Sequence, residues 1–225
     1  MQPIAQRAMS PEIIKRIDDA GVIAVLVIEN LKHALPVAEA LLKGGVDAVE
    51  LTLRTPVALD AAKLIKKEFP QINLGFGTVL TVDQVKAVVD LGADFAVAPG
   101  CNPKILKEAY DKKLSFAPGI VTPSDIEIAL EHGCRVLKLF PAVTSGGMEN
   151  LKNMVAPYSY LGLSFIPLGG INIANSRSYL ESNLITAVGG SWLAKKDLIE
   201  AENWDAITKN SQEIRDLITD IKSNK

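Results

Sequence analysis

Lys138 stands inside the short apolar run RVLKLFPA, residues 135–142, which has the composition of a buried strand. Burial in apolar surroundings disfavours the charged form of a lysine side chain. The neutral amine is a nucleophile that condenses with a ketone to form a Schiff base, and the protonated imine then accepts electrons when a carbon–carbon bond breaks. The position of Lys138 therefore indicates imine chemistry.

A second expected strand, AVELTLR at residues 48–54, carries polar side chains at every other position. Because successive side chains of a strand point to opposite faces, Glu50, Thr52 and Arg54 share one face. Glu50 is suited to move protons during imine formation. Arg54 is suited to hold a substrate carboxylate through two hydrogen bonds.

Glycines give a common register for these two strands. Glu50 follows Gly45 by five residues, and Lys138 follows Gly133 by five residues. Equivalent positions on the second and sixth strands of a (β/α)8 barrel lie in one interior layer, so the two side chains should meet. They could also form a purely structural ion pair, which would stabilise the fold only weakly. The polar face of residues 48–54 favours catalysis.

Two glycine pairs, in LGGI at residues 168–171 and VGGSW at residues 188–192, end the last two expected strands. Glycine lets backbone N–H groups approach an anion closely. The ends of strands seven and eight are a frequent phosphate site in barrels. The sequence therefore predicts phosphate binding there.

Eight short β-rich runs alternate with stretches of helical periodicity. These runs span residues 22–28, 48–54, 73–79, 95–100, 114–120, 135–142, 163–171 and 185–191. The pattern predicts one α/β domain over residues 1–225, a (β/α)8 TIM barrel with an extra N-terminal helix at residues 10–20 that plugs the floor. A doubly wound open sheet is the alternative, but no G-x-G-x-x-G turn follows the first run.

Capping residues mark several expected helix starts. Thr81 with Gln84 predicts a capping box. Three further starts are predicted where a capping residue precedes proline. These are Thr55-Pro56, Asn102-Pro103 and Thr122-Pro123. A closing amphipathic helix is expected from residue 203 onward.

Composition narrows the function classes. Of the 225 residues, 48% are apolar, 5% are aromatic, and the net charge is −2, so neither nucleic acid nor a membrane is an expected partner. The first 16 residues lack the apolar core of a signal peptide, and a cytoplasmic location is expected. The sequence shows no carboxylate–histidine cluster of the kind that binds a metal ion. The histidines His33 and His132 fall on helices expected at the surface, so no metal site is predicted. Cys134 is expected to be a buried filler, and Cys101 to lie near the substrate.

Together these stretches resemble a known family, the class I 2-keto-3-deoxy-6-phosphogluconate (KDPG) aldolases, also called 4-hydroxy-2-oxoglutarate (KHG) aldolases. The similar stretches, in order along the chain, are GGVDAVELTLRTP, GFGTVL, AVAPG, PGIVTPSD, KLFPA, GGI and GGSWL. The resemblance implies a homotrimeric barrel that needs no cofactor. It implies reversible cleavage of a phosphorylated keto-acid to pyruvate and glyceraldehyde 3-phosphate.

The resemblance also implies roles for particular residues. Lys138 corresponds to the Schiff-base lysine and Glu50 to the general acid/base. The residues implied around the pyruvate carboxylate are Arg54, Thr78 and Pro99, with Phe140 packed beside them. The residues implied at the phosphate are Gly169, Gly170, Gly189, Gly190 and Ser191.

Leu168 departs from the family pattern. Relatives that cleave the gluconate substrate often carry threonine before GGI, whereas relatives that act on the galactonate epimer tend to carry an aliphatic residue. The sequence therefore leaves 2-keto-3-deoxy-6-phosphogalactonate as an alternative substrate. Two other classes are weaker alternatives: a sugar-phosphate isomerase or epimerase has no need of Lys138, and a barrel that only binds a ligand has no need of the full Lys138, Glu50 and Arg54 set.

Overall fold

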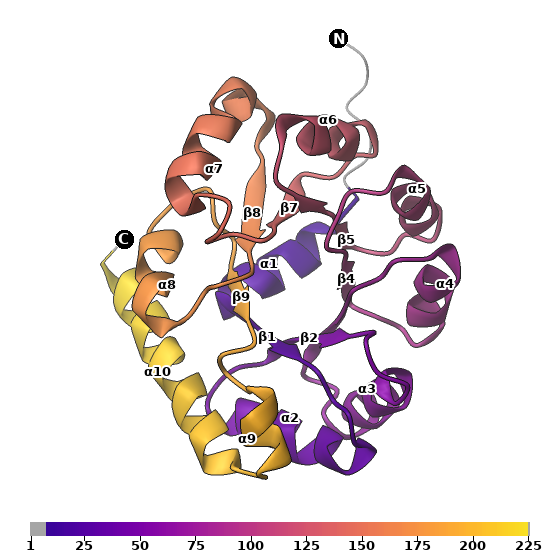
Figure 1. The fold of residues 1–225 in the computed structure, drawn as a ribbon, viewed down its shortest axis with the longest axis vertical. Helices are drawn as coiled ribbons and strands as arrows, with labels where there is room; N and C mark the ends of the chain where they lie inside the picture. Colours follow the sequence, from indigo (N-terminus) through magenta and orange to yellow (C-terminus); the bar gives the residue numbers. More distant parts are fainter. Residues whose placement is uncertain (1–7, 225) are drawn as a thin grey trace.

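A computed structural model describes residues 8–224 of the chain. The N-terminal residues 1–7, which the signal-peptide argument included, lie outside the described residues. The described strands are short and parallel, and they alternate with helices along the chain (Figure 1). The expected α/β class is confirmed.

The strands form a curled parallel sheet in two hydrogen-bonded parts. Their bounds are β1 Val22–Leu26, β2 Ala48–Thr52, β3 Asn73–Gly77, β4 Phe95–Val97, β5 Phe116–Ala117, β6 Gly119–Ile120, β7 Val136–Leu139, β8 Ser164–Pro167 and β9 Val188–Gly190. One part has the order β5-β4-β3-β2-β1-β9, and the other has the order β6-β7-β8.

Backbone contacts connect the two parts at both edges. The expected strand at 114–120 is divided at Pro118, which has no N–H to donate to a neighbouring strand. The carbonyl of Pro118 nevertheless accepts a hydrogen bond from the Lys138 N–H at 2.8 Å. At the other edge, Phe165 of β8 forms an isolated bridge with Ile185, just before β9.

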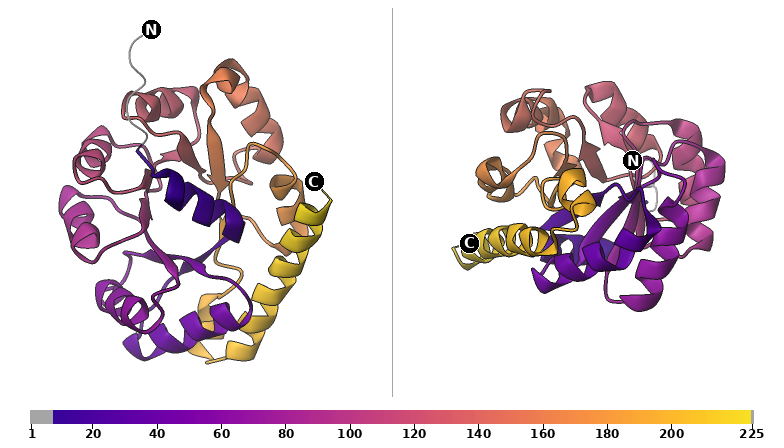
Figure 2. Two further views of the ribbon diagram at one scale, coloured as in Figure 1. Left: turned by 180° about the vertical axis from the view of Figure 1, so that it is seen from behind. Right: turned by 60° about the horizontal axis from the view of Figure 1, so that its bottom comes forward.

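Ten α-helices and two 3₁₀ helices are described within residues 8–224. The α-helices are α1 Pro11–Ala20, α2 Ala34–Lys43, α3 Ala58–Glu68, α4 Val82–Asp90, α5 Pro103–Asp111, α6 Pro123–Glu131, α7 Gly147–Val155, α8 Ile173–Leu180, α9 Lys196–Glu200 and α10 Trp204–Ser223. The 3₁₀ helices are η1 Leu31–His33 and η2 Ala156–Leu161. Helices α2 to α10 surround the strands, while α1 lies across the middle of the ring, as the view from behind also shows (Figures 1 and 2).

Most of the predicted helix starts are confirmed. Thr81 and Thr122 each form a capping box, and Asn102 caps α5. The start predicted at Thr55-Pro56 is wrong, because α3 begins at Ala58 without a side-chain cap. The Thr55 hydroxyl instead donates to the carbonyl of Ile28 at 2.6 Å, which fastens the end of β2 to the segment after β1.

Two apolar clusters pack against the two faces of the curled sheet. The larger cluster lies between the outer strand faces and the surrounding helices. The smaller one joins Ile13 and Ile17 of α1 to inward-facing strand residues such as Phe95, Val136 and Ile166. Burying the apolar face of α1 against the inner strand faces removes both surfaces from water. The inner space is therefore packed, with α1 covering one end.

Candidate active site

Lys138 of β7 and Glu50 of β2 meet inside the curled sheet. The lysine Nζ donates to the glutamate Oε1 at 3.1 Å and lies 3.4 Å from Oε2. The two residues are only 5% and 2% exposed. The prediction that the two side chains share one layer is confirmed.

The local pattern of β7 explains the direction of Lys138. Val136 and Lys138 lie on the same face, and Val136 belongs to the inner cluster, whereas Leu137 and Leu139 belong to the outer one. Alternation along the strand therefore forces the ammonium group inward. Phe140, which is 36% exposed, holds its ring centroid 5.4 Å from the Lys138 Nζ. The aromatic face adds an attraction for the cationic form at this end of the pair.

Arg54 follows the end of β2 and is held by Thr52. The Arg54 Nε donates to the Thr52 hydroxyl oxygen at 3.2 Å, and that hydroxyl donates to the Leu26 carbonyl at 2.9 Å. Within residues 8–224, neither terminal nitrogen of Arg54 has a hydrogen bond or an ion pair with another side chain. The end of the guanidinium is therefore available to bind a carboxylate through two N–H groups.

Replacing Thr52 with valine tests this support for Arg54. Valine keeps the shape of threonine but cannot accept the Nε hydrogen bond, and such a bond contributes about 1 kcal/mol. We expect the KM for pyruvate, measured from the concentration dependence of borohydride trapping, to rise about fivefold. Serine at position 52 should restore it. An unchanged KM would show that Arg54 needs no partner at Thr52.

Thr78 and Pro99 follow β3 and β4, at the same end of the sheet as Arg54. Thr78 has a φ of 61°, a left-handed conformation that is rare for a residue other than glycine and asparagine. Strain of this kind costs about 1–3 kcal/mol and tends to occur at functional sites. Pro99 is exposed, and its carbonyl lies so close to Gly119 that a Cβ there would come within 2.1 Å of it. Both residues thus lie at the strand ends near which Arg54 is found, and their part in carboxylate binding stays a prediction.

The glycines expected at the phosphate lie at the ends of β8 and β9. Gly169 and Gly170 have φ values of 91° and 84°, which a residue with a side chain would rarely adopt. Gly189 and Gly190 lie within β9, and Ser191 follows as an exposed residue. The two predicted glycine pairs therefore end neighbouring segments of the sheet.

Leu168 faces the interior between these glycine pairs. It is 4% exposed and belongs to the inner cluster. A Cβ added at Gly189 would lie 2.8 Å from the Leu168 Cγ, so the leucine side chain fills the space beside β9. A hydroxyl at position 168 would replace that apolar contact.

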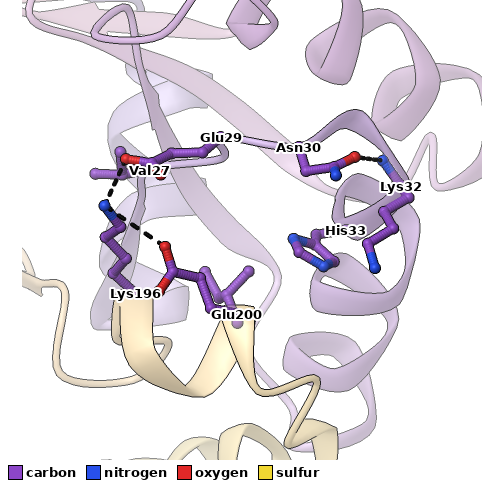
Figure 3. Close-up of a pocket in the computed structure, with 8 residues that line it drawn as sticks. Val27, Glu29, Asn30, Lys32, His33, Lys196 and Glu200 are labelled. Carbon is purple, nitrogen blue, oxygen red and sulfur yellow. Dashed lines mark hydrogen bonds and ion pairs between the residues drawn. The ribbon is translucent and has the colours of Figure 1, made fainter.

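A separate pocket of about 290 Å³ lies between the segment after β1 and helix α9 (Figure 3). Lys196 closes one side through ion pairs with Glu29 at 2.7 Å and Glu200 at 3.5 Å. His33 lines the other side. None of the residues proposed for catalysis or substrate binding lines this pocket, so we assign it no part in the chemistry.

The prediction that His33 is a surface residue is wrong. It is only 7% exposed, and its ring centroid lies 5.9 Å from that of Trp204. Trp204, which packs against His33, is the first residue of α10 and lies far along the chain. His132, in contrast, is partly buried at the end of α6, with its Nδ1 2.9 Å from the Ile128 carbonyl oxygen.

The two cysteines have the environments of unreactive thiols. Cys134 is buried as predicted, and Cys101 is partly buried beside the backbone carbonyl of Asp125, to which its Sγ donates at 3.4 Å. Burial raises the pKa of the Cys101 thiol to about 12, with the Asp125 charge as a smaller cause. Burial likewise raises the pKa of the Cys134 thiol to about 12.

We expect both thiols to resist alkylation in the folded protein, because the thiolate is the nucleophile. Iodoacetamide at about pH 8 should label them slowly in buffer and rapidly in denaturant, as measured by mass spectrometry. Rapid labelling of native Cys101 would contradict this expectation.

The raised thiol pKa values also make folding stability depend on pH. The folded chain keeps these protons while the unfolded chain loses them above about pH 9, so the free energy of unfolding should fall as the pH rises through that range.

The site and the fold together define a class of protein, the α/β Schiff-base aldolases. The defining features are a buried lysine–carboxylate pair inside a curled parallel sheet and an arginine at the strand ends.

Among residues 8–224, no group of three or more His, Cys, Asp or Glu side chains is arranged to hold a metal ion. The described helices include none with the length and apolar character needed to span a bilayer.

Comparison with known proteins agrees with this class. The family model for KDPG and KHG aldolase matches residues 13–210. The KHG/KDPG aldolase of Escherichia coli K12 is 41% identical over 85% of this chain and 89% of its own. The chain therefore belongs to the KDPG and KHG aldolase family.

Two solved structures are similar in fold and sequence. A Legionella pneumophila KDPG aldolase, with pyruvate captured as a covalent carbinolamine intermediate, is 38% identical, with a TM-score of 0.84 over 88% of this chain and 96% of its own. A Zymomonas mobilis KDPG aldolase with 3-phosphoglycerate is 37% identical, with a TM-score of 0.80 over 89% of this chain and 93% of its own.

Proposed function

We propose that this chain is a class I aldolase that reversibly cleaves KDPG to pyruvate and glyceraldehyde 3-phosphate through a Schiff base on Lys138. The observation that carries the proposal is the buried contact of 3.1 Å between the Lys138 Nζ and the Glu50 carboxylate. The carbinolamine of the Legionella relative supports the imine route. The KHG/KDPG name of the Escherichia coli relative supports 4-hydroxy-2-oxoglutarate as a further substrate.

The reaction begins when Glu50 accepts a proton from the Lys138 ammonium group, and the freed amine attacks the C2 ketone of the substrate. Glu50 returns this proton to the hydroxyl of the carbinolamine, which leaves as water, so that the iminium ion forms and Glu50 is again a carboxylate. Glu50 lies 3.1 Å from Nζ, close enough to move protons at the adjacent atoms. It receives the proton of the C4 hydroxyl as the C3–C4 bond breaks, and the electron pair of that bond flows into the iminium to form an enamine. Protonation of C3 and hydrolysis of the imine release pyruvate.

The remaining site residues are proposed to orient the substrate. Arg54, Thr78 and Pro99 hold the carboxylate next to C2, and Phe140 packs beside them. The phosphate at the other end of the substrate binds to backbone N–H groups at the strand ends, where glycines permit close approach. The residues proposed for this phosphate site are Gly169, Gly170, Gly189, Gly190 and Ser191.

Covalent trapping tests the proposed function. The protein is incubated with pyruvate and borohydride, which reduces an imine to a stable secondary amine, and the adduct is located by peptide mass spectrometry. We expect one pyruvate-derived adduct, on Lys138. Absence of an adduct on Lys138, in protein shown to be folded, would refute the Schiff-base mechanism.

The galactonate epimer is a second candidate substrate because the apolar Leu168 side chain faces the interior beside Gly189. Replacing Leu168 with threonine adds a hydroxyl there, and a hydrogen bond from it contributes about 1 kcal/mol. We expect the ratio of kcat/KM for the gluconate over the galactonate substrate to rise about fivefold. The same ratio in Leu168→Val, which adds no hydroxyl, should stay close to that of the wild type. Equal ratios in all three proteins would remove Leu168 from epimer selection.

We further propose that residues 1–225 form one domain whose sheet closes into a (β/α)8 barrel, with α1 as its floor. Hydrogen bonds at both edges of the curled sheet support closure. A homotrimer is proposed from the family resemblance, and the cytoplasmic location expected from the sequence stays a proposal. Light scattering after gel filtration should then give about three times the chain mass of 24.2 kDa.

A further inference from the structure

The Glu50 carboxylate occupies the space that a side chain at Gly77 would fill. A Cβ built on Gly77 would lie 1.9 Å from the Glu50 Oε1, 2.6 Å from its Cδ and 2.8 Å from its Cγ. Gly77 is the last residue of β3 and pairs with Thr52 of β2. The atom in the closest conflict, Oε1, is also the atom that accepts the hydrogen bond from Lys138.

The requirement at position 77 is for space and not for backbone freedom. Gly77 lies within a regular strand and does not have the positive φ that favours glycine. Its carbonyl accepts a hydrogen bond from the Leu53 N–H at 2.8 Å, so the backbone is fixed to β2. Alanine could adopt this conformation, but its methyl group could not share the space with the carboxylate.

The glycine two residues earlier faces a different neighbour. A Cβ at Gly75 would lie 2.2 Å from ring atoms of Phe95, so that glycine makes room for an apolar side chain of the inner cluster. Of the two glycines in β3, Gly77 is therefore the one in contact with the ion pair.

A side chain at position 77 would leave Glu50 few alternatives. The glutamate is 2% exposed, so its carboxylate cannot simply swing into water. A methyl group at position 77 would force Oε1 away from its present position, in which it lies within hydrogen-bonding range of the Lys138 Nζ at 3.1 Å. Proton transfer needs that range.

We propose that Gly77 is a positioning residue whose missing side chain provides the slot that holds the Glu50 carboxylate against Lys138. The inference rests on the proposed function, because it assigns Gly77 to the proton-transfer step of the same reaction. It predicts that Gly77→Ala impairs proton transfer while leaving the carboxylate-binding side, around Arg54, intact.

The test compares wild type, Gly77→Ala and the control Gly100→Ala, whose Cβ would meet nothing within 4 Å. Exchange of the pyruvate methyl protons in D₂O, followed by NMR, reports proton transfer at C3 through the enamine. We expect Gly77→Ala to slow exchange more than about tenfold, with the KM for pyruvate within about twofold of wild type. Gly100→Ala should match wild type. Wild-type exchange in Gly77→Ala would overturn the inference.

A double-mutant cycle covers the case in which Gly77→Ala is unstable. If the slot serves Glu50, alanine at position 77 should lower the melting temperature in the wild-type background but not in Glu50→Ala, which removes the carboxylate. An equal loss in both backgrounds would mean that Gly77 has a purely structural role. Absence of exchange in the wild type itself would instead refute the proposed function, so the two failures are distinguishable.

Discussion

Replacing Lys138 with methionine is expected to reduce cleavage of KDPG to the background of the assay, because no amine remains to form the imine. The same change leaves the Glu50 carboxylate buried without its cation. Removing one partner of a buried pair destabilises a protein by about 3–5 kcal/mol. The melting temperature of Lys138→Met should therefore fall, as measured by calorimetry.

A second replacement separates these two effects. In Lys138→Met with Glu50→Leu, both charges are gone and the volume is nearly kept, so the stability should return to that of wild type or above it. Activity should stay at background in both variants. Cleavage by Lys138→Met above background would contradict the nucleophilic role, and equal stability of the single variant and wild type would contradict the burial of an unpaired charge.

Replacing Glu50 with glutamine is expected to lower kcat by about 10²- to 10⁴-fold, the usual contribution of a general acid/base. Glutamine has nearly the shape of glutamate and can still accept a hydrogen bond from Lys138, but it cannot take up a proton. Steady-state kinetics with KDPG and the pyruvate proton-exchange rate should fall together. The pyruvate adduct on Lys138 should still form, at a reduced rate, because the amine remains.

The control for Glu50 is Glu39→Gln. Glu39 is exposed on α2 and forms a surface ion pair with Lys43 at 3.0 Å, so its loss should leave kcat unchanged. A kcat close to wild type in Glu50→Gln would assign the proton transfers to another group. Loss of the folded state in Glu50→Gln, but not in Glu39→Gln, would point to a structural ion pair.

Local patterns predicted most of the elements, and the errors have identifiable physical causes. Strand positions followed from short apolar runs, although the run at residues 114–120 is divided at Pro118, whose ring nitrogen cannot donate. The helix start at Thr55-Pro56 failed because the threonine hydroxyl bonds to Ile28 of another segment. His33 is buried because Trp204, remote in sequence, covers it.

The sequence by itself determined which faces the proposed catalytic residues share. Alternation along a strand is fixed by covalent geometry, so the inward direction of Glu50 and Lys138 could be derived from their register alone. The sequence did not determine how the two side chains are held once they meet. The space above Gly77 that the Glu50 carboxylate occupies, beside Lys138, became visible only when β2, β3 and β7 were placed together. Distances across the interior depend on the packing of segments far apart in the chain, and only the tertiary structure decides them.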